Sequence, residues 1–171
     1  MKTNVNSWAL YLLFMAVQLV MTNYLHLSQF VTLSILPALI MCLPLSFAPW
    51  LAMVFAFVTG LTVDFFAEGV IGLNTVALLP VAALRNLVIQ LVIGSDAIER
   101  GMDFNFKKNG PAKVATVILI PLVFFLGIYI AADGAGMRPF WFNCARFAAS
   151  LAVDLFLCLM VVKTLNPDDR R

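Results

Sequence analysis

Six apolar stretches fill most of this 171-residue chain and leave short polar connections between them. They are Trp8 to Leu25, Phe30 to Leu45, Ala48 to Phe66, Gly72 to Ile93, Ala112 to Ala132, and Phe140 to Leu165. Most reach the ~17 to 25 residues that a helix needs to cross a hydrocarbon layer. Hydrophobic residues make up 63% of the chain and charged residues 12%, which is far more apolar than a soluble domain. The sequence therefore predicts an all-α integral membrane protein with a single transmembrane domain over residues 1–171.

The second stretch is short and contains Pro37 and Pro44, so a re-entrant hairpin is the alternative to a spanning helix. With six spans and a cytoplasmic N-terminus, only Arg138 lies in an outer loop. The cytoplasmic side then holds Lys2, Arg100, Lys107, Lys108, Lys113, Lys163, Arg170 and Arg171. Because Lys and Arg favour cytoplasmic loops and five spans would remove this bias, we expect six transmembrane helices in one bundle, with both termini in the cytoplasm.

Four charged residues that lie away from the cytoplasmic ends of the predicted spans need a partner or a purpose, since a charge at membrane depth costs at least ~2.5 to 3.5 kcal/mol. Counted at ~1.5 Å per residue from the outer helix ends, Asp64 and Arg146 lie about 6 to 9 Å deep. On the same count Arg85 and Asp154 lie about 20 Å deep. The depths match by opposite sign, so we expect two buried ion pairs, Arg85 with Asp154 and Asp64 with Arg146. The alternatives are a substrate site or proton relay, or a chance arrangement with snorkelling side chains.

Small residues recur at intervals of four along the third predicted span, at Ala48, Ala52, Ala56 and Gly60. Asp64 continues the same line one helical turn later. Small side chains at this spacing let helix backbones approach closely in lipid. We therefore expect this ridge to face another helix.

Gly69 and Gly72 predict a tight turn after this span, because glycine readily adopts positive φ. Gly72 would open the next helix, whose free amides favour a carboxylate. We expect these amides to receive the carboxylate of Asp64 or Glu68. The alternative is a turn that only closes a hairpin.

Groups suited to catalysis or metal binding are sparse in this sequence. The single histidine, His26, is far from any candidate nucleophile, and the acidic residues do not form the spaced clusters that hold metal ions. The cysteines Cys42, Cys144 and Cys158 fall in apolar runs without a metal-binding or disulfide spacing. A net charge of +2 is too small to indicate nucleic-acid binding. We expect a protein that is not an enzyme and that holds no metal or cofactor.

The string GLTVDFF at residues 60–66, followed by GVIGLN at residues 69–74, resembles the signature of the rod shape-determining MreD family. The motif covers about thirty residues with its flanks, while the length and the predicted six-span layout of the whole chain are similar too. Carried over by position, Gly60, Asp64, Gly69 and Gly72 correspond to the core of the motif. Ile71 departs from it, because the family commonly has proline or leucine there.

The resemblance implies a non-catalytic scaffold subunit of the bacterial cell-elongation complex, in the inner (cytoplasmic) membrane. Its implied partners are the single-span membrane protein MreC and other members of the complex, such as RodA and MreB, which act in peptidoglycan synthesis and rod shape. The main alternative is the substrate-binding membrane subunit of an energy-coupling-factor vitamin transporter, a six-helix fold to which the MreD family is similar. Such subunits commonly carry an Ala-x-x-x-Ala motif in the first span, which Ala9 and Ala16 do not form. A generic membrane assembly factor is a third possibility.

Overall fold

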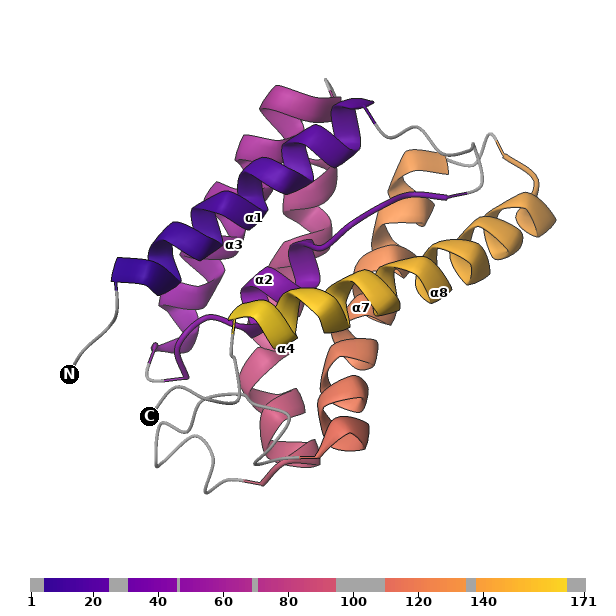
Figure 1. The fold of residues 1–171 in the computed structure, drawn as a ribbon. Coiled ribbons are helices and arrows are strands. Elements are labelled where there is room, and N and C mark those ends of the chain that lie inside the picture. Colours follow the sequence, from indigo (N-terminus) through magenta and orange to yellow (C-terminus); the bar gives the residue numbers. More distant parts are fainter. Residues whose placement is uncertain are drawn as a thin grey trace.

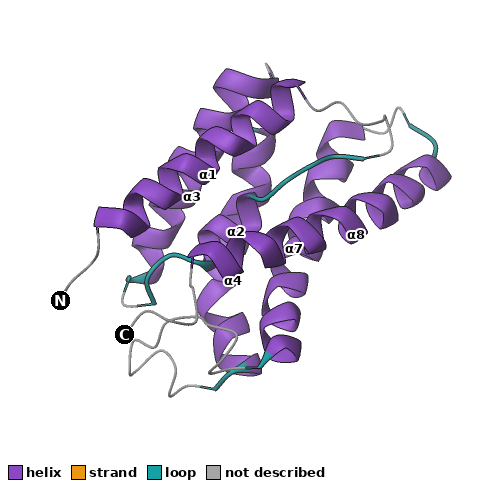
Figure 2. Cartoon of the chain, in the orientation of Figure 1, coloured by secondary structure: helices purple, strands orange, loops and turns teal. Residues whose placement is uncertain are grey.

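The computed structural model describes residues 5–24, 31–45, 47–68, 71–94, 110–134 and 138–165. Within these ranges all regular secondary structure is helical, and short loops join the helices (Figure 2). The elements are α1 (Val5–Tyr24), α2 (Leu36–Met41), α3 (Pro49–Val63), the π-helical turn η1 (Asp64–Glu68), α4 (Leu73–Val92), α7 (Pro111–Gly134) and α8 (Phe140–Leu165).

Four of the described helical segments are long and apolar enough to cross a membrane. They are Pro49–Phe66, Leu73–Val92, Pro111–Gly134 and Phe140–Leu165. Large apolar side chains on their outer faces are exposed, among them Trp50, Leu91, Phe124 and Phe156, as expected of surfaces that contact lipid. The apolar helix Trp8–Tyr24 is shorter. The chain is therefore a multi-pass, all-helical membrane protein, as the sequence predicted.

The long helices pack in chain order, with α3 against α4, α4 against α7, and α7 against α8 (Figure 1). α1 lies alongside α3 and is joined to it by aromatic and polar contacts. The ring of Trp8 lies 5.5 Å from that of Phe55 and 6.1 Å from that of Phe47, between centroids. The hydroxyl groups of Tyr11 and Thr59 share a buried hydrogen bond of 2.8 Å.

The second apolar stretch does not form the spanning helix that the sequence predicted. α1 and α3 run in the same direction, so the chain between them returns along the bundle (Figure 1). It does so with residues 31–35 outside any helix, followed by the six-residue α2. Pro37 lies in the first turn of α2 and Pro44 follows its end, which fits a helix this short. The expected second spanning helix is therefore corrected to an irregular passage with one short helix.

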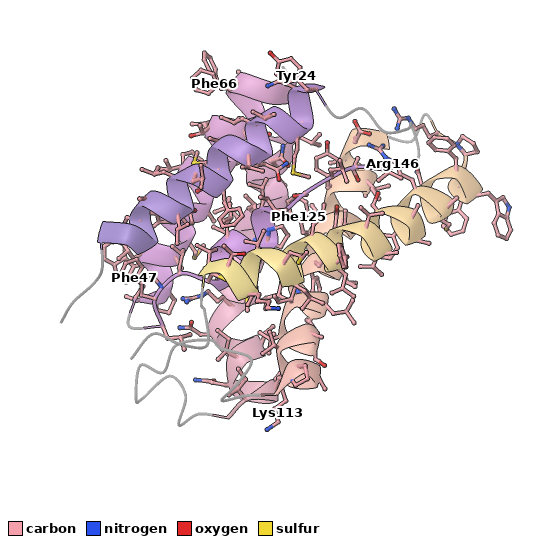
Figure 3. All side chains as sticks on the ribbon, in the orientation of Figure 1. Tyr24, Phe47, Phe66, Lys113, Phe125 and Arg146 are labelled. Carbon is pink, nitrogen blue, oxygen red and sulfur yellow. The ribbon has the colours of Figure 1, made fainter. Side chains whose placement is uncertain are left out.

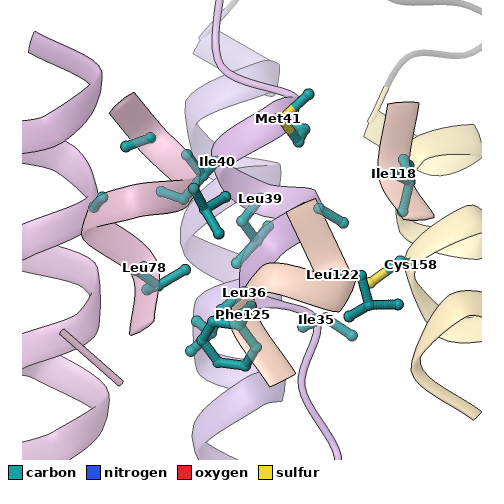
Figure 4. Packing of buried hydrophobic residues seen from close by; sticks show 14 of the residues in the cluster. Ile35, Leu36, Leu39, Ile40, Met41, Leu78, Ile118, Leu122, Phe125 and Cys158 are labelled. Atoms are coloured by element: carbon teal, nitrogen blue, oxygen red, sulfur yellow. The ribbon is translucent and has the colours of Figure 1, made fainter. Parts of the chain in front are cut away.

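α2 forms the centre of the hydrophobic core. It contacts α1, α3, α4, α7 and α8, and all six of its residues are buried. Figure 4 shows Leu36, Leu39 and Ile40 of α2 among side chains from α4, α7 and α8. Uniform burial explains why this segment is as apolar as a lipid-facing helix. Its sequence is apolar because protein, rather than lipid, surrounds it on every side.

Candidate functional site

Asp64 is completely buried where α3 passes into η1, and its carboxylate accepts five hydrogen bonds. Oδ1 accepts from the backbone N–H of Asn74 at 2.8 Å and from its side-chain Nδ2 at 3.0 Å. Oδ2 accepts from the backbone N–H of Gly72 at 3.0 Å, and from the backbone N–H and hydroxyl of Thr75 at 3.1 and 2.7 Å. We call these contacts the Asp64 cap, since all the donors lie at the start of α4.

The Asp64 cap supplies what the start of α4 lacks. The first amides of a helix have no partner within the helix, and an unsatisfied amide at membrane depth costs several kcal/mol. Capping residues usually satisfy them with a side-chain oxygen, but the N-cap of α4 is Gly72, with φ 105° and no side chain. The carboxylate of Asp64, from the preceding helix, takes that place. The expectation that the amides of α4 receive this carboxylate is confirmed, while the side chain of Glu68 lies outside the described residues.

Gly60 brings α3 close enough to α4 for this contact. A Cβ atom at Gly60 would lie 2.7 Å from Cα and 2.9 Å from the backbone N of Thr75, so the two backbones touch. Ala52 and Ala56 continue the same line and are buried. Ala48 is exposed and forms the N-cap of α3, so the predicted packing ridge does not extend to this residue.

Gly60→Ala should lower the thermal unfolding midpoint in detergent, because backbone atoms of Thr75 cannot move aside as a flexible side chain would. Forcing extra bulk into such a contact costs roughly 1–3 kcal/mol. Gly127→Ala is the matched control, since nothing lies within 4 Å of a Cβ atom at that helical glycine. The control should be neutral or stabilising, as alanine favours helix by up to ~1 kcal/mol. Equal midpoints for the two variants would contradict the close approach of α3 and α4.

The remaining positions of the motif lie around this junction. Gly69 lies outside the described residues, and Ile71 is exposed beside Gly72. Phe65 and Phe66 are also exposed and meet edge to face at 5.2 Å between ring centroids. Figure 3 shows Phe66 pointing outward at one end of the bundle. The carboxylate of Asp64 therefore points into the protein, and the aromatic rings of the motif are exposed.

The predicted pairing of Asp64 with Arg146 is wrong. Arg146 is buried, and its Nη1 forms an ion pair with Oδ2 of Asp133 at the end of α7. Arg138 donates to the same oxygen at 3.2 Å. The donors of α4 already occupy both oxygens of Asp64. Asp133 was missed because the predicted span ended at Ala132.

The predicted pairing of Arg85 with Asp154 is also wrong, although both residues are completely buried. Oδ1 of Asp154 accepts from the backbone N–H of Ser34 at 3.0 Å, and Oδ2 has no hydrogen-bond partner. Arg85 donates from Nη2 to the carbonyl of Leu43, while its Nε and Nη1 have none. Ser34 precedes α2 and Leu43 follows it. The carboxylate thus lies at the N-terminal end of α2 and the guanidinium at its C-terminal end, which is the arrangement that a helix dipole favours.

Side chains of α8 satisfy the non-helical backbone of residues 31–35. Ser150 accepts from the backbone N–H of Thr32 at 2.9 Å, as Asp154 does from that of Ser34. The thiol of Cys158 donates to the carbonyl of Ser34 at 3.7 Å. Four residues of helix advance about 6 Å, and two residues of extended chain advance about 6.6 Å. Side chains one turn apart on α8 can therefore reach backbone groups two residues apart in the segment.

Gln18 of α1 completes these contacts from the opposite side. Its Nε2 donates to the carbonyl of Leu33 at 3.1 Å, and its Oε1 accepts from the backbone N–H of Ile35 at 2.8 Å. Non-helical backbone is tolerated at membrane depth only where protein groups satisfy it. Gln18 and Ser150 were not among the residues predicted from the sequence. Ser150 lies four positions before Asp154 in a predicted span, and this spacing could have indicated a polar face on that helix.

Most of the polar side chains of the described interior hold ends of helices or non-helical backbone, while the hydroxyls of Tyr11 and Thr59 join α1 to α3. No group of three His, Cys, Asp or Glu that could hold a metal ion occurs among the described residues. Fold and site together define a multi-pass helical membrane protein with polar contacts concentrated at helix ends. Comparison with protein-family models, curated proteins and solved structures finds no match to this chain.

Proposed function

We propose that this chain is a non-catalytic scaffold subunit of the bacterial cell-elongation complex, bound to an MreC-like single-span protein in the inner membrane. The Asp64 cap is the observation that supports this proposal. Gly60, Asp64 and Gly72, which the motif resemblance singled out, meet at one junction between α3 and α4. Their role there is architectural, which suits a subunit that acts by presenting a fixed surface to other proteins.

The proposed orientation places both termini in the cytoplasm. Lys113 lies in the first turn of α7, at the bottom of the view in Figure 3, and Lys163 lies in the last turn of α8. Arg146 lies toward the other end (Figure 3). Positive residues favour the cytoplasmic side, so we infer that the end with Lys113 faces the cytoplasm.

A second candidate is the substrate-binding subunit of an energy-coupling-factor vitamin transporter. One observation favours it: Arg85 and Asp154 carry buried polar atoms without partners inside the bundle. Unpartnered ionisable groups at membrane depth often mark substrate or ion pathways.

Depletion of the protein separates the two candidates. In a rod-shaped bacterium that depends on this machinery, depletion should produce rounder cells, and re-expression of the wild-type chain should restore rods. The Gly127→Ala variant should restore them as well, because it leaves the Asp64 cap untouched. Loss of uptake of a single vitamin with cell shape unchanged would instead favour the transporter and contradict the proposed function.

A further inference from the structure

Two arginines converge on one carboxylate where α7 ends and α8 begins. The Nη1 atoms of Arg146 and Arg138 both donate to Oδ2 of Asp133. Residues 135–137, which complete the connection, are Ala, Gly and Met and add no side-chain charge. Two positive side chains and one negative one leave this cluster with a net charge of +1. We call these three residues the Asp133 cluster.

Burial divides the two arginines of the Asp133 cluster. The side chain of Arg146 is only 8% exposed, and its Nε is buried without a hydrogen-bond partner. The side chain of Arg138 is 43% exposed, and its guanidinium lies 5.7 Å from the ring centroid of Phe142. Ring and carboxylate hold this guanidinium in place, because cations are attracted to aromatic faces. Arg138 therefore presents a positioned group to the outside, backed by a second, buried positive charge.

The neighbouring aromatic residues indicate where the cluster lies in the membrane. Phe140 and Trp141, the first two residues of α8, are 75% and 82% exposed, and their rings meet at 6.3 Å between centroids. Exposed tryptophan at the end of a spanning helix is typical of the membrane interface. The Asp133 cluster is thus expected at the depth of the lipid headgroups, where phosphate groups are concentrated.

We propose that the Asp133 cluster binds the phosphate group of a phospholipid in the leaflet at this end of the bundle. Guanidinium groups bind phosphate through paired, charge-assisted hydrogen bonds. Arg138 supplies the donors that reach the lipid. Arg146 adds a second, buried positive charge, and the single negative charge of Asp133 does not balance both arginines. The site does not depend on the proposed role in cell elongation.

Arg138→Gln tests this site, with Lys113→Gln as the matched control, because Lys113 is an exposed cation at the opposite end of α7. The purified proteins in detergent would be titrated with phosphatidylglycerol, and retained lipid measured by native mass spectrometry. Wild type and Lys113→Gln should retain the lipid alike. Arg138→Gln should bind it at least about tenfold more weakly, because the paired, charge-assisted hydrogen bonds of the guanidinium are lost. Arg138→Lys, which keeps the charge but loses the paired geometry, should fall between them.

Two results would overturn the proposal. Equal losses of lipid binding in Arg138→Gln and Lys113→Gln would show that the lipid is attracted to any positive side chain and not to the Asp133 cluster. A wild-type protein that binds inorganic phosphate but retains no phosphatidylglycerol would show that the ligand is free phosphate. Size-exclusion profiles matching the wild type would establish that each variant is folded.

Discussion

Asp64→Ala should lower the thermal unfolding midpoint more than an alanine substitution at any position of α3, because five donors lose their acceptor together. The side chains of Asn74 and Thr75 can turn to other partners, but the three backbone amides cannot. Each buried unsatisfied donor costs about 1–3 kcal/mol, so we expect a loss of at least ~3 kcal/mol. In a protein of this size that corresponds to a drop of roughly 6–12 °C, measurable by thermal unfolding in detergent.

Asp64→Asn tests the chemistry of the Asp64 cap more sharply. The amide keeps the size of the carboxylate but replaces one acceptor oxygen with a donor, which would face N–H or O–H groups that also donate. We therefore expect Asp64→Asn to lose most of the stability that Asp64→Ala loses. Thr62→Val is the control, since the hydroxyl of Thr62 only bonds back to the carbonyl of Val58 in its own helix. Wild-type stability in Asp64→Asn would contradict the cap.

The contacts of Asp64 were predictable because they are local in sequence. Gly72 follows Asp64 by only eight residues, and the two are separated by a turn that the glycines of the sequence predict. The first backbone amides of any helix lack partners within the helix and lie at the positive end of its dipole, so a nearby carboxylate is expected to bind them. Gly60 was identified on the same grounds, as the last small residue of a regularly spaced ridge.

Matching depths could not identify the partners of the buried charges, since depth in the membrane fixes only one of the three coordinates of a residue. Arg146 and Asp64 can lie at similar depths on different sides of the bundle. The actual partner, Asp133, lies just across the α7–α8 connection, 13 residues earlier in the sequence. Short-range connectivity was therefore the better guide than depth.

The second apolar stretch shows a different limit of sequence analysis. Hydropathy reports that a segment avoids water, but lipid and protein interior satisfy that preference equally well. α2 is surrounded by five other helices, so its residues are as apolar as those of a spanning helix. Its brevity was indicated by Pro37 and Pro44, which made the hairpin an alternative. The partners of the adjoining backbone, Gln18 and Ser150, come from distant parts of the chain.

Arg85→Leu and Asp154→Leu should each destabilise the protein, because each removes a hydrogen bond at one end of α2. Hydrogen bonds to charged groups contribute about 1.5–3 kcal/mol, and the carbonyl of Leu43 or the amide of Ser34 would be left buried without its partner. Lys113→Leu serves as the control, because changes at exposed positions usually stay within about 0.5 kcal/mol. The readout is the thermal unfolding midpoint in detergent.

The double variant distinguishes two roles for these charges. If Arg85 and Asp154 formed a direct pair, each single variant would cost about 3–5 kcal/mol and replacing both residues by leucine would be nearly neutral. If they hold opposite ends of α2, the losses should add, with a coupling energy below ~1 kcal/mol that reflects only their interaction across the helix.

A double-mutant cycle on Arg85 and Asp154 is therefore the most direct test of whether the buried charges of this protein hold helix ends. The predicted result is a double variant whose midpoint falls by nearly the sum of the two single losses. A double variant more stable than either single variant would show a direct ion pair, and would contradict the placement of these residues at the two ends of α2.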